Sequence, residues 1–111
     1  MAKDDYHVVV FRILRYLYMQ LKEGKPVDPD MLRCDSKICQ VNESYWRYIL
    51  ISMQEEGQIR GLKKGKGQAG YDRLEDQLKD IQITPKGIEI LSDSRMNERV
   101  DQLVKNILKL A

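Results

Sequence analysis

The sequence has few of the residues from which metal sites and hydrolytic centres are built. Among its 111 residues are one histidine, His7, and two cysteines, Cys34 and Cys39. A structural zinc site takes about four nitrogen or sulfur ligands, so we expect no metal and no cofactor. No nucleophile, base and orienting acid can be combined around the lone histidine. We therefore expect a protein that is not an enzyme and has no small-molecule substrate.

The sequence has two cysteines, with four residues between them. The simplest interpretation of Cys34 and Cys39 is a pair of reduced thiols, as in most cytosolic proteins. The alternative is a disulfide or redox pair.

Long apolar runs are also missing. The longest aliphatic or aromatic run is Val8–Phe11, whereas a membrane-spanning helix needs about 20 residues. No signal-peptide pattern precedes it. The composition is 42% hydrophobic and 32% charged, which is typical of a soluble globular protein. We expect a cytoplasmic protein that forms a single domain over residues 1–111 and contacts no membrane.

Neither sign of charge dominates. The sequence has 19 Lys and Arg against 17 Asp and Glu, a net charge of +2, and its pI is about 8.5. This balance permits a nucleic-acid partner without requiring one, because many dedicated binders have a pI above about 9.

An amphipathic helix is expected over residues 5–24. Apolar residues recur there at steps of three and four, namely His7, Val10, Phe11, Leu14, Leu17, Tyr18 and Leu21. A second stripe lies on another side, formed by Val9, Ile13 and Tyr16. A helix that is apolar on two sides has to bury both, so the second stripe requires another helix or a partner subunit.

Residues 29–57 are expected to form a helix-turn-helix. Asp28-Pro29 is a start signal for a short helix. Asn42 can cap a longer helix that ends at Gly57. The expected buried face of that helix is Trp46, Ile49, Leu50 and Met53. Its expected exposed face is Glu43, Ser44, Arg47, Tyr48 and Ser52.

Residues 58–84 are expected to form a hairpin, or wing. Ile59–Leu62 is a plausible first strand, and the alternation in Leu78–Thr84 indicates the return strand. The segment Tyr71–Gln77 fits a strand, a loop or one helical turn equally well.

Helices are expected again over residues 85–110. Thr84-Pro85 starts the first of them, and Ser92–Ser94 breaks it from the second. The last helix carries a stripe that includes Val100, Leu103, Val104 and Ile107. This stripe is the candidate partner of Val9, Ile13 and Tyr16. Folding back within one chain is slightly favoured over a homodimer.

This order of elements predicts a mainly α protein with a small β-hairpin, namely a winged helix-turn-helix with an added C-terminal helix. Three segments, Val41–Trp46, Glu55–Ile59 and Ile83–Leu91, resemble the YjcQ-like family of small bacterial and prophage winged-helix proteins. The resemblance spans roughly Tyr6 to Leu110. It implies this fold and a prophage context. It implies no established activity, although a phage structural role has been suggested for the family.

Four cations near the hairpin are candidate contacts for DNA phosphates: Arg60, Lys63, Lys64 and Lys66. A solvated loop explains them equally well. On the helix before the hairpin, Ser44, Arg47 and Tyr48 would face the groove. Acidic residues on the same helix make it a poor reader of the major groove. A protein–protein adaptor or a phage assembly protein is therefore the alternative to a DNA-binding regulator.

A glycine pattern, Gly65–Gly70, matches the dinucleotide fingerprint G-x-G-x-x-G. The strand before such a turn is normally buried and continuously apolar, whereas Arg60, Lys63 and Lys64 precede this one. We interpret the glycines as turn formers at the tip of the hairpin.

Overall fold

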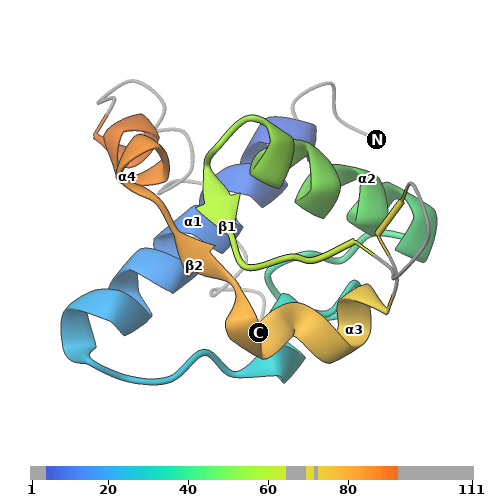
Figure 1. Ribbon diagram of the computed structural model, residues 1–111, viewed down its shortest axis with the longest axis horizontal. Coiled ribbons are helices and arrows are strands. Elements are labelled where there is room, and N and C mark those ends of the chain that lie inside the picture. The colour runs from blue at the N-terminus through green and yellow to red at the C-terminus, as the bar shows by residue number, and fades with distance from the viewer. Residues whose placement is uncertain (1–4, 65–69, 72, 93–111) are drawn as a thin grey trace.

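The protein is mainly helical and has a small two-stranded antiparallel sheet (Figure 1). A computed structural model describes residues 5–64, 70–71 and 73–92. The elements in chain order are α1 (Asp5–Glu23), the 3-10 turn η1 (Pro29–Leu32), α2 (Glu43–Glu55), β1 (Ile59–Arg60), α3 (Leu74–Gln77), the 3-10 turn η2 (Leu78–Asp80), β2 (Gln82–Ile83) and α4 (Pro85–Leu91).

The long helix α1 runs behind the two strands and contacts α2, β2 and α4 (Figure 1). The predicted helix over residues 5–24 is confirmed. The predicted inner stripe is buried along its middle, at Val10, Phe11, Leu14 and Leu17. It is wrong at its ends, because His7 and Leu21 are exposed. These residues lie near the two ends of the 19-residue helix, whereas the buried residues lie in its middle.

The second stripe of α1 is also largely buried. Val9 is 3% exposed and Ile13 is fully buried, and both belong to the same core as the first stripe. Tyr16 is half-buried, and its hydroxyl accepts a hydrogen bond from the Asp28 backbone N–H at 2.9 Å. The expected partners of this stripe, Val100, Leu103, Val104 and Ile107, lie outside the described residues.

Local capping starts η1 and α2 where the sequence predicts. The Asp28 carboxylate accepts from the Asp30 N–H at 3.0 Å, and the Asn42 side chain accepts from the Tyr45 N–H at 2.8 Å. The four predicted core residues of α2 are at most 1% exposed: Trp46, Ile49, Leu50 and Met53. The Trp46 indole donates to the Leu32 carbonyl at 2.8 Å. This bond joins α2 to η1 without leaving a buried N–H unpaired.

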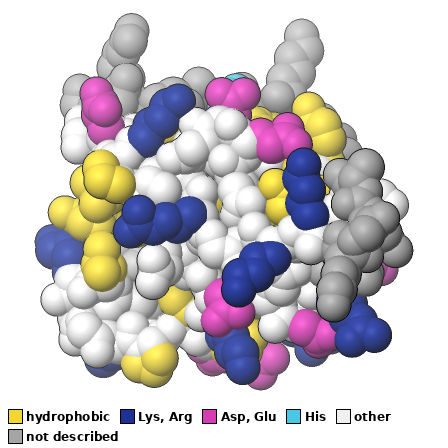
Figure 2. All heavy atoms as spheres, in the orientation of Figure 1, with side chains coloured by type: hydrophobic (Ala, Val, Ile, Leu, Met, Phe, Trp, Pro, Cys, Tyr) yellow, Lys and Arg dark blue, Asp and Glu magenta, His cyan; other side chains and the backbone are white. Residues whose placement is uncertain are grey.

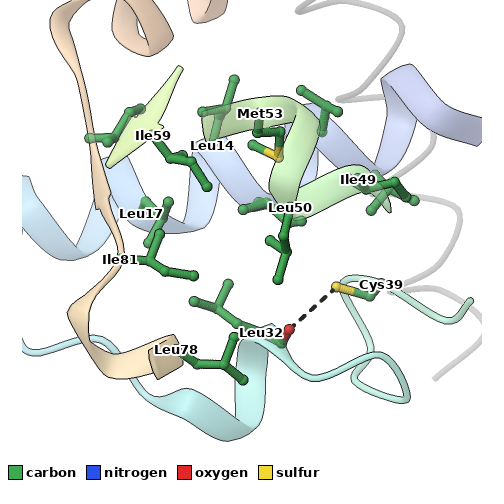
Figure 3. Packing of buried hydrophobic residues seen from close by; sticks show 14 of the residues in the cluster. Leu14, Leu17, Leu32, Cys39, Ile49, Leu50, Met53, Ile59, Leu78 and Ile81 are labelled. Carbon is green, nitrogen blue, oxygen red and sulfur yellow. Dashed lines mark hydrogen bonds between the residues drawn. The ribbon is translucent and has the colours of Figure 1, made fainter. Parts of the chain in front are cut away.

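The predicted return strand, Leu78–Thr84, is mostly wrong. Of this segment only Gln82 and Ile83 pair with β1, with Ile59 opposite Ile83, and Leu78–Asp80 form η2. The predicted first strand, Ile59–Leu62, is likewise shortened to Ile59–Arg60. The segment Tyr71–Gln77, which from its sequence fits a strand, a loop or one helical turn, contains one helical turn, α3. Leu74, Leu78 and Ile81 explain the difference, because all three are at most 1% exposed. Their spacing of four and three residues is helical, and Figure 3 shows Leu78 and Ile81 beside Leu32 in the core.

Helix α4 begins at Pro85 as predicted. The Thr84 hydroxyl accepts from the Gly87 N–H at 3.2 Å and donates to the Gly57 carbonyl. Thr84 therefore connects the end of α2 to the start of α4. The helix ends at Leu91 with Ser92 as its C-cap. The predicted helix that follows lies outside the described residues.

Candidate nucleic-acid interface

The chain between β1 and β2 covers residues 61–81, of which the structure describes 61–64, 70–71 and 73–81. We call this segment the connection. From β1, residues 61–64 run beneath α2 toward the start of that helix (Figure 1). The connection carries Lys63 and Lys64, both exposed. It also carries Tyr71, whose backbone carbonyl accepts a hydrogen bond from Arg47 Nη2 of α2 at 2.9 Å. The connection therefore brings its lysines to the same part of the molecule as a cation of α2.

Tyr71 is in contact with two cations. Besides the Arg47 bond, it forms an isolated antiparallel bridge with Lys64. The Lys64 ammonium lies 5.9 Å from the centroid of the Tyr71 ring, which is within range of a cation–π contact. We call Arg47, Lys63 and Lys64 the basic patch.

Gln54 of α2 holds the connection through its side-chain amide. Its Oε1 accepts from the Leu62 N–H at 2.7 Å, and its Nε2 donates to the Leu62 carbonyl at 2.8 Å. The same Nε2 lies 3.0 Å from the Tyr71 hydroxyl. Gln54 thus pairs with the Leu62 backbone as a neighbouring strand would.

Gln77 makes the equivalent pair with the next residue of the connection. Its Oε1 accepts from the Lys63 N–H, and its Nε2 donates to the Lys63 carbonyl at 3.1 Å. The backbone of Leu62 and Lys63 is therefore bonded to glutamines from two different elements, α2 and α3. Nothing in the sequence signals these bonds, because glutamine has no strong preference for such a position.

The remaining candidates on α2 are exposed. Ser44 lies in the first turn beside exposed Glu43. Tyr48 is 62% exposed, and its ring meets that of Tyr6 edge-on with centroids 6.1 Å apart.

Two residues predicted to be exposed, Arg47 and Ser52, are half-buried. The connection covers part of Arg47 through its bond to Tyr71, and the Ser52 side chain is hydrogen-bonded to Tyr6. Helix α2 therefore carries both Arg47 of the basic patch and the exposed Tyr48.

Arg60 belongs to a different surface. It lines an open cleft of about 620 Å³ together with Lys25, Lys79 and Asp80. Its Nε donates to Gln82 Oε1 of the paired strand at 3.3 Å. Lys66, the fourth predicted phosphate contact, lies outside the described residues.

One cation near the patch was not predicted. Arg73 is exposed and has a positive φ of 51°, two residues after Tyr71. The sequence pattern offers no signal for it, because left-handed backbone favours Gly, Asn and Asp over arginine.

The charges of this face are mixed. Figure 2 shows Lys and Arg side chains spread over the face that carries both strands, with Asp and Glu side chains between them. Such a surface produces no strong field of one sign, so attraction to a polyanion depends on local groups such as the basic patch.

The two thiols are free and differ in environment. Cys39 is 1% exposed and Cys34 is half-buried. Burial raises the pKa of the Cys39 thiol to about 11, an effect that a hydrogen bond with Ser36 partly offsets. Its Sγ lies 3.9 Å from the Leu32 carbonyl oxygen (Figure 3). Cys39 is thus a core residue with little thiolate at neutral pH.

Other kinds of site receive no support from the described part of the chain. Within residues 5–64, 70–71 and 73–92, no group of three or more His, Cys, Asp or Glu is arranged to hold a metal ion. In the same ranges no helix has the length and hydrophobicity needed to cross a membrane.

The fold and this site define a small, mainly helical protein in which a basic patch spans a helix and the connection between two short strands. The sequence model of the YjcQ protein family matches residues 11–110. The chain therefore belongs to the YjcQ family, as its sequence motifs indicate. No curated protein and no solved structure matches it.

Proposed function

We propose that this YjcQ-family protein is a winged-helix protein that binds double-stranded DNA, acting as a prophage-associated regulator. In this proposal α2 is the recognition helix and the connection is the wing. The main support is the attachment of Arg47 and Lys64 to the same residue, Tyr71. This attachment joins a cation of the helix and a cation of the wing in one surface that phosphates can meet.

The basic patch suits phosphates better than bases. One Arg47 amino group already donates to the Tyr71 carbonyl, which leaves fewer free N–H groups for a two-pronged contact with guanine. Glu43 lies beside Ser44, where a carboxylate repels phosphate. We therefore expect binding that depends weakly on DNA sequence and strongly on salt.

The proposal is tested by measuring affinity for generic duplex DNA at several salt concentrations. Three phosphate contacts give a slope of log K against log salt of about −2.7, at about −0.9 per contact. The double variant K63E/K64E should weaken binding to all sequences alike. Its control is K22E/K25E, which changes the net charge equally in and just after the last turn of α1 and should bind better than K63E/K64E. Absence of wild-type binding at about 50 mM salt contradicts the proposal.

A protein–protein adaptor is the second candidate, and it includes a role in phage assembly. Tyr48 favours it, because this residue is 62% exposed and exposed tyrosines frequently dominate binding energy at interfaces. The test is co-purification from the native host. The control is Met19→Ala, because Met19 of α1 is also an exposed hydrophobic residue. A stoichiometric partner that is lost with Tyr48→Ala and retained with Met19→Ala supports this candidate, and retention in both variants counts against it.

A further inference from the structure

We infer that Gln54 is a positioning residue for DNA: it fixes the wing against the recognition helix so that Lys63 and Lys64 stand beside Arg47. This inference rests on the proposed DNA binding. Gln54 would touch no nucleic acid itself.

The geometry of the Gln54 amide supports this role. One side chain is bonded to Leu62, where the lysine segment begins, and to Tyr71, where it ends. Lys63 and Lys64 come directly after Leu62, and the Lys64–Tyr71 bridge joins the two ends. Both ends of the segment are therefore fixed to the same residue of α2.

The position of Gln54 on α2 matters as well. It lies seven residues after Arg47, or about two turns along the same face of the helix. Arg47 bonds the Tyr71 carbonyl and Gln54 bonds its hydroxyl. Tyr71 is thus held at two points by one rigid helix, and the ammonium of Lys64 lies over its ring.

A positioning residue and a residue that contacts phosphate affect the salt dependence of binding differently, because Gln54 carries no charge. Loss of a phosphate contact reduces the salt slope by about 0.9. A variant without Gln54 keeps the same cations, so the slope of log K against log salt stays the same. Its connection is no longer fixed to α2, however, and has to become ordered when DNA binds. The affinity then falls at every salt concentration.

The experiment compares Gln54→Leu with a matched control, Gln20→Leu. Gln20 lies on α1, and its Nε2 donates to the Pro26 carbonyl at 2.8 Å, so this control removes a side chain–backbone bond that involves neither α2 nor Lys63 and Lys64. Binding is measured at a temperature at which circular dichroism shows both variants folded. We expect Q54L to bind DNA about tenfold more weakly than Q20L with an unchanged salt slope. The Leu62 amide should exchange its hydrogen faster in Q54L alone.

A second variant keeps the inference testable if Q54L does not fold. Tyr71→Phe removes only the hydroxyl that lies against Gln54 and should weaken binding about threefold with the slope unchanged. If wild type binds DNA but both variants stay within twofold of Q20L, the positioning role is overturned while DNA binding stands. If wild type does not bind at all, the proposed function and this inference fail together.

Discussion

At the scale of single residues, the turn from β1 into the connection depends on a glycine. Gly61 has a φ of +112°, and a Cβ placed there would lie 2.1 Å from the Asp80 carbonyl oxygen. Gly61→Ala therefore combines backbone strain with a clash, and we expect it to lower the free energy of unfolding by about 3 kcal/mol. Gly24→Ala is the control, because Gly24 also has a positive φ but has open space around it. We expect it to cost about 1 kcal/mol. Urea denaturation of both variants measures the difference, and equal losses would contradict the clash.

The buried thiol of Cys39 predicts a pH dependence of stability. Burial raises its pKa to about 11, whereas a thiol in the unfolded chain ionises near pH 8.5. Between these values the unfolded state binds fewer protons, so stability is complete below about pH 8.5 and is lost as the pH rises toward 11. At pH 10.5 the loss amounts to about 2 to 3 kcal/mol.

The measurement is the free energy of unfolding at pH 7 and pH 10.5 for wild type, Cys39→Ala and Cys34→Ala. Other groups also titrate in this range, so the informative quantity is the difference between variants. C39A should lose less stability than wild type over the interval, and C34A should behave like wild type. A C39A protein with the wild-type pH dependence would show that this thiol does not contribute.

At the scale of elements, the cap of α2 stabilises the proposed recognition helix. Asn42 accepts the Tyr45 N–H at 2.8 Å, which satisfies one of the unpaired donors at the start of the helix. We expect Asn42→Ala to cost about 1 kcal/mol and Asn42→Asp to cost almost nothing, because aspartate caps equally well. Thermal denaturation followed by circular dichroism distinguishes them. Equal melting temperatures for N42A and N42D would contradict the cap.

The element starts were predictable because their signals are local. Asp28, Asn42 and Thr84 each bond a backbone N–H two or three residues further on, so the cap and its target lie within one short window of sequence. The buried face of α2 was predictable for the same reason, since four core residues at helical spacing define it.

The connection was not predictable because its structure depends on distant partners. Alternation in residues 78–84 indicates a strand, but Leu78 is buried in η2, near η1 in the fold. The contacts of Gln54 and Gln77 with Leu62 and Lys63 join residues 8 and 14 positions apart. No periodicity marks a glutamine that bonds backbone at that separation. The composition of the candidate site could be predicted in part, whereas its assembly around Tyr71 could not.

At the scale of the whole molecule, the two apolar stripes of α1 bear on oligomeric state. A second stripe that needs a partner subunit would stay exposed in one chain. Instead Val9 is 3% exposed, and Ile13 is fully buried in the core that also contains Leu14 and Trp46. This burial favours a stabilising role for Ile13 within one chain over a role at a dimer interface.

The two roles predict different responses to protein concentration. If Ile13 is a core residue, Ile13→Ala costs about 2 to 5 kcal/mol of unfolding free energy, and its urea midpoint does not change with protein concentration. If Ile13 joins two subunits, the midpoints of wild type and variant rise with concentration, since association stabilises the folded state by mass action. We expect the first result over a hundredfold range of concentration.

Tyr48→Ala, at an exposed position, serves as the control and should change stability by less than about 0.5 kcal/mol. A concentration-dependent midpoint for wild type would instead support a homodimer.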